Sequence, residues 1–381
     1  MAVPDGCTRP VSRCLLPHLN RLLIVLGLCI LLCSSAVSAA ELVLNTSSME
    51  QYKAGISYSG TDPLVITIAD DVAIASTSYT GIESTAPVTI RSPAGKTLTI
   101  MVRNNSVLLY GITAPAVTLE SGHLAIIVNG NNDGEKGNAF GISAGAGNVT
   151  VAGGSVATSV ETTGHKNKGI YASRYIIISD GQVTTDERGG SNTFGLDGGD
   201  VENGDASGGI LISGGVVAVN SSGGKNRNVG IDSKFGTVRI SGSPVILIYE
   251  DGSAARQNYV YNTNITTISG GHAVVFTSDG GNYTLRENAI LAQNITLIAG
   301  KTFEIPAGRS LSIADGTYLT KPSGTTLLFG GDSGTLTYSR SFAGAGGAVI
   351  YAGSEPTQRA ALPVAVLLAG FGAAVLMRRK E

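Results

Sequence analysis

The chain has 381 residues, of which 43% are hydrophobic, 14% are charged and 52 are glycine, and its formal net charge is −2. A mildly acidic chain lacks the basic surface that nucleic acid requires, which excludes nucleic acid as a partner. All four cysteines precede residue 40, so the rest of the chain has no thiol for a disulfide or a thiolate metal site.

Residues 1–39 have the pattern of a secretory signal peptide. Arg9, Arg13 and Arg21 precede an apolar run, Leu22 to Cys33, and small residues then lead to a cleavage site near Ala39 or Ala40. An uncleaved membrane helix is the alternative, but the apolar run is short for a bilayer. We therefore predict that the protein is exported.

The middle of the chain consists of short segments rich in Val, Ile and Thr, bounded by glycine pairs, which predict strands and turns. A Gly-Ile or Gly-Leu pair recurs at intervals of 26 to 35 residues. These pairs begin at Gly55, Gly81, Gly111, Gly141, Gly169, Gly195 and Gly230. A second motif follows each pair, as in VTLESG, VTVAGG, IIISDG and ILISGG. A repeat of this length indicates an array of stacked units.

A single unit is too short to bury its own apolar face, whereas stacked coils form one continuous core. We therefore predict an all-β, right-handed parallel β-helix over residues 40–341, with about ten coils of about 28 residues. A β-sandwich with regular turns is the alternative. The glycines are expected at corners with positive φ. The predicted inward residues are Ile142, Val149, Val151, Ile170, Ile176, Ile178, Ile210, Ile212, Ile231, Val238 and Ile240.

The C-terminal residues have the pattern of a surface anchor. Residues 342–359 are rich in Gly, Ala, Ser and Pro and predict a flexible stalk. Residues 360–377 are apolar and long enough for a transmembrane helix, and the basic residues at 378–381 predict a cytoplasmic tail. A sorting segment that is clipped for covalent attachment would look the same. Either interpretation predicts a membrane-anchored chain with an extracellular solenoid at the cell surface.

Three coils carry a resemblance to a known family: GISAGAGNVTVAGGSV, GILISGGVVAV and GIDSKFGTVRISGSPV. Between a signal peptide and a short C-terminal anchor, they resemble the adhesin-like β-helix proteins of methanogenic archaea and related bacterial carbohydrate-binding β-helix modules. The likeness extends over about residues 55–271 and lies in the style of the repeat. It implies the fold more strongly than the ligand.

Two loops predict calcium binding, because oxygen-bearing side chains alternate with glycine in an exported protein. An ordinary solvated turn is the alternative for both, since turns favour the same residue types. The predicted ligands are Asn129, Asn131, Asp133 and Glu135 in the first loop, and Asp197, Asp200, Glu202 and Asp205 in the second.

Basic and amide residues precede successive Gly-Ile pairs and predict a binding groove for an acidic polysaccharide or a cell-envelope glycan. The predicted sugar-binding residues are Lys136, Lys166, Lys168, Lys225, Arg227, Tyr259 and Tyr261. Asn138, Asn167, Asn192 and Asn228 are expected to stack from coil to coil. A structural amide ladder with solvated lysines is the alternative.

Enzymatic activity is the remaining question, because polysaccharide lyases and glycoside hydrolases also use this fold. A hydrolase requires two carboxylates that face one groove. The candidates are Asp70 with Asp71, Asp186 with Glu187, the Asp197 to Asp205 cluster and Asp279, and none resembles the signatures of those enzymes. We therefore predict a non-enzymatic, carbohydrate-binding adhesin. A structural envelope protein without a specific ligand and a polysaccharide-degrading enzyme are the alternatives.

Overall fold

The computed structural model describes residues 39–131, 137–199, 208–233, 235–261, 266–269, 272–330, 335–337, 340–344 and 347–351. The chain divides into two compact units, Met1–Ala39 and Ala40–Glu381. Every strand described below belongs to the second unit, which is considered by itself.

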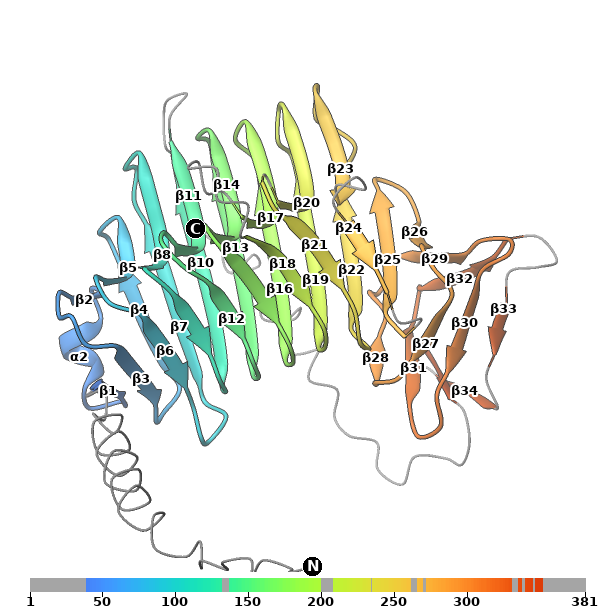
Figure 1. Ribbon diagram of the computed structural model, residues 1–381, viewed down its shortest axis with the longest axis horizontal. Helices are drawn as coiled ribbons and strands as arrows, with labels where there is room; N and C mark the ends of the chain where they lie inside the picture. The colour runs from blue at the N-terminus through green and yellow to red at the C-terminus, as the bar shows by residue number, and fades with distance from the viewer. Residues whose placement is uncertain are drawn as a thin grey trace, which may run out of the picture. The chain divides into compact units, whose positions relative to one another are not determined.

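Three sheets run through the second unit, and from β3 to β24 the chain visits them in the repeating order A, C, B (Figure 1). Sheet A consists of β1 (Ala40–Leu44), β3 (Leu64–Ile68), β6 (Val88–Arg91), β9 (Val117–Leu119), β12 (Val149–Val151), β15 (Tyr175–Ile178), β18 (Gly209–Ile212), β21 (Thr237–Ile240) and β24 (Thr266–Ile268). Sheet B consists of β2 (Ile56–Tyr58), β5 (Thr80–Ser84), β8 (Leu108–Ala114), β11 (Asn138–Ala144), β14 (Lys166–Ala172), β17 (Asn192–Gly198), β20 (Arg227–Ser233) and β23 (Gln257–Tyr261).

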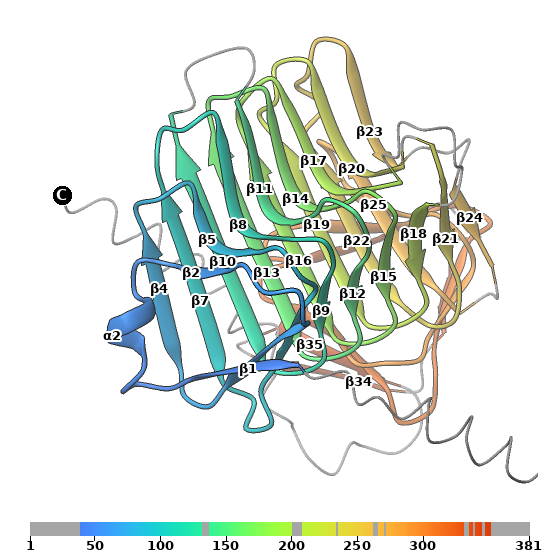
Figure 2. The same cartoon turned by 60° about the vertical axis from the view of Figure 1, so that its left-hand side comes forward.

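Sheet C begins with eight strands that pair in parallel, coil upon coil. They are β4 (Val72–Ser76), β7 (Thr97–Arg103), β10 (His123–Gly130), β13 (Ser155–Thr162), β16 (Gln182–Arg188), β19 (Val216–Ser222), β22 (Val245–Glu250) and β25 (Val274–Asp279). Figure 2 shows the strands of successive coils side by side. The predicted all-β parallel solenoid is confirmed, with about ten turns and a period of about 28 residues, and a β-sandwich is excluded.

The core of residues 40–279, here called the long-coil region, is one continuous apolar cluster. All the predicted inward Ile and Val residues belong to it, and each is at most 1% exposed. The short helix α2 (Met49–Tyr52) lies in the first coil, where Met49 and Tyr52 pack against this cluster. The motif positions therefore predict the core correctly.

The glycines of the Gly-Ile pairs have a different role from the one predicted. Apart from Gly55, none of those that begin a pair has a positive φ. They lie in mid-strand of sheet B and allow close approach: a Cβ added to Gly141 would lie 2.5 Å from the carbonyl oxygen of Gly169 and 2.7 Å from Cγ2 of Thr158 in sheet C. The glycine column thus sets how closely sheets B and C approach one another.

One set of positive-φ corners belongs to glycines at or near the end of the second motif, between a sheet A strand and the following sheet C strand. Gly122, with φ of +87°, is an example, and the N–H of Ser155 in the next coil donates to its carbonyl oxygen. Other residue types adopt this conformation only with strain. The equivalent glycines of other coils are Gly95, Gly154, Gly181, Gly215 and Gly242.

The last coils, residues 283–337, are shorter and are here called the short-coil region. Their strands pair in parallel with partners 20 to 25 residues away. They are β26 (Tyr283–Leu285), β27 (Ala289–Leu291), β28 (Ile295–Thr296), β29 (Thr302–Ile305), β30 (Ser310–Ile313), β31 (Tyr318–Pro322), β32 (Thr326–Phe329) and β33 (Thr335–Thr337). The strands β34 (Arg340–Gly344) and β35 (Gly347–Tyr351) pair antiparallel. The strand β35 also pairs antiparallel with β31.

The apolar core changes sides of sheet C where the two regions meet. In β25, Val275 belongs to the long-coil core, whereas its neighbours Val274 and Phe276 belong to a second core. Successive side chains of a strand point to opposite faces, so one strand serves both cores. Phe276 meets Phe303 edge-on with ring centroids 5.2 Å apart, and Phe303 stacks on Tyr283 at 4.8 Å.

Candidate functional site

The outer face of sheet B presents a row of polar residues, one from each of five successive coils. Parallel register places Asn138 beside Lys166, Lys166 beside Asn192, and Asn192 beside Arg227, with Gln257 next. We call these five residues the polar row. Asn167, the residue after Lys166, is fully buried, so strand alternation places Lys166 on the outer face. Neighbouring members of the row are about 4.8 Å apart.

The members of the polar row differ in how freely they meet solvent. Lys166 and Asn138 are half-buried, while Asn192 is buried and donates its Nδ2 hydrogen to the carbonyl of His165 at 3.0 Å. Arg227 is exposed, as is Lys225 in the turn before β20. Among the predicted basic residues that the structure describes, these two cations are the ones exposed to solvent.

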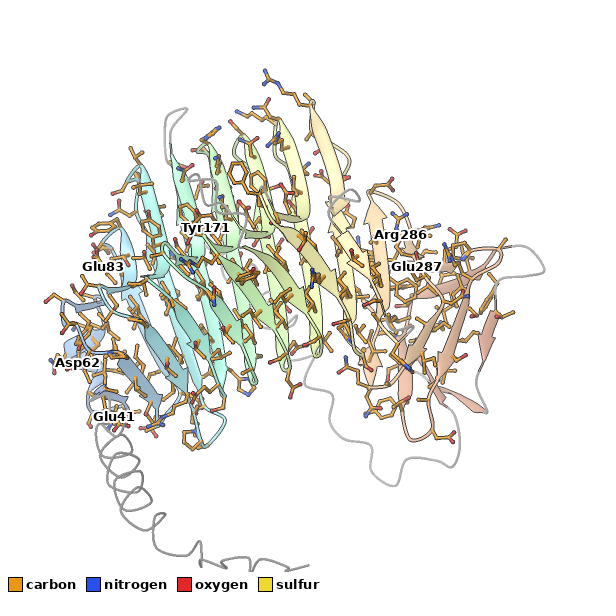
Figure 3. The ribbon with its side chains drawn as sticks, viewed as in Figure 1. Glu41, Asp62, Glu83, Tyr171, Arg286 and Glu287 are labelled. Atoms are coloured by element: carbon orange, nitrogen blue, oxygen red, sulfur yellow. The ribbon has the colours of Figure 1, made fainter. Side chains whose placement is uncertain are left out.

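Aromatic side chains form the neighbouring row on the same face. Tyr110 stacks on Phe140 with ring centroids 5.1 Å apart, and Phe140 meets Tyr171 at 5.6 Å. Tyr110 and Tyr171, the latter labelled in Figure 3, are half-buried, whereas Phe140 and Phe194 are buried. Burial raises the pKa of Tyr110, so its hydroxyl stays protonated. The half-buried tyrosine rings offer apolar surface with a polar end, which suits contact with a sugar ring.

Lys168 is buried and forms an ion pair. Its Nζ lies 2.5 Å from Oδ2 of Asp197, and the two side chains are 5% and 8% exposed. Asp197 is part of β17, so its inclusion in the predicted calcium loop is wrong. Lys168 is likewise no solvent-facing member of a basic stripe. Nothing in the sequence around Lys168 or Asp197 indicates that the two residues pair.

The expected stack of four asparagines is also wrong. Asn138 and Asn192 both lie beside Lys166 on the outer face, whereas Asn167 and Asn228 both lie beside Thr193 in the interior. The number of residues before the mid-strand glycine of each coil separates the two groups. The outer asparagines precede this glycine by three positions and the inner ones by two. The single amide ladder therefore resolves into two rows on opposite faces.

The inner row belongs to a buried polar network that the sequence pattern does not reveal. The hydroxyl of Thr193 donates to Oδ1 of Asn228 at 2.8 Å and therefore accepts from the hydroxyl of Ser221 at 2.6 Å. The side-chain amide of Asn167 donates to the carbonyls of Thr162 and Arg188 at 3.1 and 2.7 Å. These bonds satisfy polar groups inside the coils and tie neighbouring coils to one another.

The candidate catalytic pair Asp186 and Glu187 points to opposite sides of its strand. Asp186 accepts two hydrogen bonds from Arg188, at 3.0 and 2.8 Å, whereas Glu187 is fully buried in the core. Burial, and next the charge of Asp186, hold the pKa of Glu187 well above its usual value. Adjacent carboxyls on opposite faces do not meet at one substrate.

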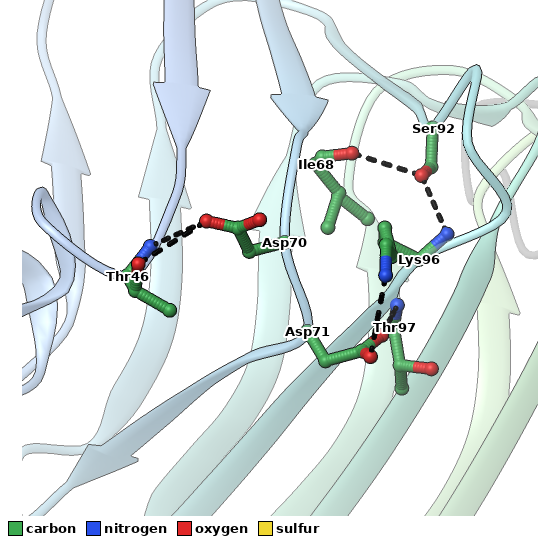
Figure 4. A network of polar contacts seen from close by, with 7 residues as sticks. All are labelled: Thr46, Ile68, Asp70, Asp71, Ser92, Lys96 and Thr97. Atoms are coloured by element: carbon green, nitrogen blue, oxygen red, sulfur yellow. Dashed lines mark hydrogen bonds and ion pairs between the residues drawn. The ribbon is translucent and has the colours of Figure 1, made fainter.

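The other candidate pair, Asp70 and Asp71, holds coils together at the start of the solenoid (Figure 4). Asp70 accepts from the backbone N–H of Thr46 at 3.0 Å, and Asp71 accepts from that of Thr97 at 2.8 Å. Lys96 lies 3.8 Å from Asp71. Each carboxylate thus serves a neighbouring coil, one on either side, and the geometry explains both without a reaction.

The first predicted calcium loop is described only in part. Asn129 is the next-to-last residue of β10 and lies between Arg103 and Glu161 in register, and the N–H of Asn131 donates to Oδ1 of Asn105 at 3.0 Å. The remaining predicted ligands lie outside the described residues: Asp133, Glu135, Asp200, Glu202 and Asp205. Within the described ranges, no three His, Cys, Asp or Glu side chains gather around a common point.

Several other predicted residues and segments are described by their backbone alone or lie outside the described residues. The backbones of Tyr259 and Tyr261 lie in β23, beside Val229 and Ile231. Lys136, residues 1–38 of the predicted signal peptide and the segment at 360–377 lie outside the described residues. In the part of the chain that the structure covers, no helix is long and apolar enough to span a membrane.

Comparison with known proteins gives no family for the chain. No protein-family model matches it, and neither a curated protein nor a solved structure is similar enough to count as a match.

Proposed function

We propose that the protein is a cell-surface, adhesin-like protein that binds carbohydrate on the outer face of sheet B, without catalysing a reaction. The observation that supports this most is the polar row, which continues over five coils beside aromatic side chains. A site that repeats once per coil suits a ligand that also repeats, such as a polysaccharide chain. We also propose that the chain is related to the adhesin-like β-helix proteins.

The chemistry of the row favours an acidic polysaccharide or a cell-envelope glycan. Arg227 and Lys225 are exposed cations that pair with sugar carboxylates, and the guanidinium of Arg227 forms two parallel hydrogen bonds with one carboxylate. Amide side chains both donate to and accept from sugar hydroxyls. The half-buried rings of Tyr110 and Tyr171 add apolar contact.

The cellular location belongs to the proposal as well. The signal peptide pattern of residues 1–39 supports export, and the apolar segment at 360–377 with its basic tail supports attachment to the membrane. The solenoid would then be extracellular, where calcium is abundant enough to fill a loop of modest affinity around Asp133.

A screen of the purified protein against a glycan array, with and without calcium, tests the proposal. We expect binding to acidic glycans that weakens as salt rises, because exposed charges are screened. The bound glycans should be recovered unchanged. Release of shortened products would favour a polysaccharide-degrading enzyme instead, and the absence of binding to every glycan would favour a structural envelope protein.

A further inference from the structure

Lys168 and Asp197 form the most deeply buried ion pair among the described residues. They come from neighbouring coils, on β14 and β17, and Nζ and Oδ2 are 2.5 Å apart. They are not register partners: Lys168 lies beside Phe194, and Asp197 lies beside Tyr171. The side chains therefore meet diagonally across the two strands.

The surroundings of the pair are aromatic. Nζ of Lys168 lies 4.1 Å from the ring centroid of Tyr171 and 5.7 Å from those of Phe140 and Phe194. The pair is almost inaccessible to solvent. An ammonium and a carboxylate that are removed from water lose much of their solvation, and their close contact with each other compensates for that loss.

We propose that Lys168 and Asp197 join in an intramolecular isopeptide bond, so that the chain links two of its own coils covalently. One proton passes from the ammonium of Lys168 to the carboxylate of Asp197, which leaves a neutral amine and a carboxylic acid. Nζ attacks Cγ, the N–Cγ bond forms, and one C–O bond breaks. The departing oxygen takes the transferred proton and one amine proton and leaves as water. The ammonium and carboxylate thus become one secondary amide and one water, with no oxidant or other reactant.

The fold supplies what this condensation requires. Both strands are fixed in a continuous parallel sheet, so the amine and the carboxyl are held in contact rather than meeting by diffusion. The low exposure of the pair keeps bulk water from the product. Asp232 is the register partner of Asp197 in the following coil and is a carboxylate on the same face, and we assign it the role of carrying a proton during the reaction.

The mass of the intact, denatured protein tests the proposal. The protein is made in a host that adds no N-linked glycans, and its mature N-terminus is determined by sequencing. We expect a mass lower than that of its sequence by one water, and a branched peptide in proteolytic digests that joins β14 to β17 through Lys168 and Asp197. A mass equal to that of the sequence, with the two peptides separate, would overturn the proposal.

Matched variants assign the linkage to its residues. Lys168→Arg keeps the positive charge but has no amine, so its measured mass should equal that of its own sequence. Lys166→Arg, two residues away in the polar row, should still lack one water. Loss of water in Lys168→Arg would assign the modification elsewhere and contradict the proposal. If Lys168→Arg does not fold, the branched peptide of the unaltered protein decides the question by itself.

Discussion

The long-coil and short-coil regions are both parallel solenoids, yet they use glycine differently. In the long-coil region, glycines such as Gly141 and Gly195 lie in mid-strand, where any Cβ would overlap the neighbouring coil. In the short-coil region, Gly300, Gly308 and Gly316 have positive φ, and a Cβ at any of them would meet nothing within 4 Å. The abundance of glycine therefore has two origins: turn geometry, which both regions use, and close packing in mid-strand, which is the role of the glycine column in the long-coil region.

The cores differ in the same sense. The long-coil core is built from Ile, Val and Leu between closely apposed sheets, whereas the short-coil core contains the large rings of Phe276, Tyr283 and Phe303. Large side chains need room that a mid-strand glycine column would remove. Each region thus combines its own coil length, glycine role and side-chain size.

Truncation of a short-coil aromatic residue should give the largest effect. Phe303 is fully buried and contacts two other rings, so Phe303→Ala should lower the free energy of unfolding by about 3–5 kcal/mol. Calorimetry should show a lower transition for the short-coil region and a nearly unchanged one for the long-coil region. A uniform shift of every transition would show that the two cores unfold as one.

Glycine substitutions test the two proposed roles directly. Gly141→Ala should cost about 3 kcal/mol, since its Cβ would overlap backbone that has little room to move. Gly308→Ala, with φ of +75° and open space, should cost about 1 kcal/mol. Gly145→Ala, with neither constraint, should be close to neutral. Urea unfolding measures all three, and equal costs would remove the distinction between the regions.

Acidity should act on the long-coil core through Glu187. Its folded-state pKa is raised by burial, so the folded protein holds this proton after the unfolded chain has lost it. The stabilisation that comes from the protonated Glu187 is fully present below about pH 4.5, the ordinary pKa. The free energy of unfolding then falls as pH rises toward the folded-state pKa. Glu187→Gln should therefore unfold at a higher temperature than the unaltered protein at pH 8, with a smaller gap at pH 4. A gap that widens on acidification would contradict this assignment.

Calcium should have the smallest effect. If the loop around Asp133 binds calcium only when folded, melting in excess calcium rather than chelator should raise the free energy of unfolding by about 1 kcal/mol. Asp133→Ala should abolish the difference. Equal midpoints for the unaltered protein in calcium and chelator would identify the loop as an ordinary turn.

The repeat predicts the fold and the core because stacking places equivalent positions of each coil in register. The inward Ile170, Ile176 and Ile178 follow from that rule. The rule also separates Asn167 from Asn192, provided that positions are counted from the glycine of each coil rather than by residue type. Coil length is less predictable, since the short coils carry no Gly-Ile pair to mark them.

The pairing of Lys168 with Asp197 lies beyond any such count. It joins non-equivalent positions of two coils, and it depends on how a long side chain bends toward a neighbour among aromatic rings. The role of the mid-strand glycines could not be inferred from the sequence for a similar reason. A sequence shows that glycine is required, but not whether φ or a neighbouring backbone requires it.

Binding by charge-reversed variants tests the proposed carbohydrate surface most directly. An acidic polysaccharide identified on the array would be titrated against Lys225→Glu with Arg227→Glu, which alters the outer face of sheet B, and against Arg239→Glu, which alters an exposed position of sheet A. We predict that the first variant weakens binding at least about tenfold, equivalent to about 1.4 kcal/mol, while the second stays within about twofold of the unaltered protein. Equal weakening by both variants, or by neither, would contradict a binding site on the outer face of sheet B.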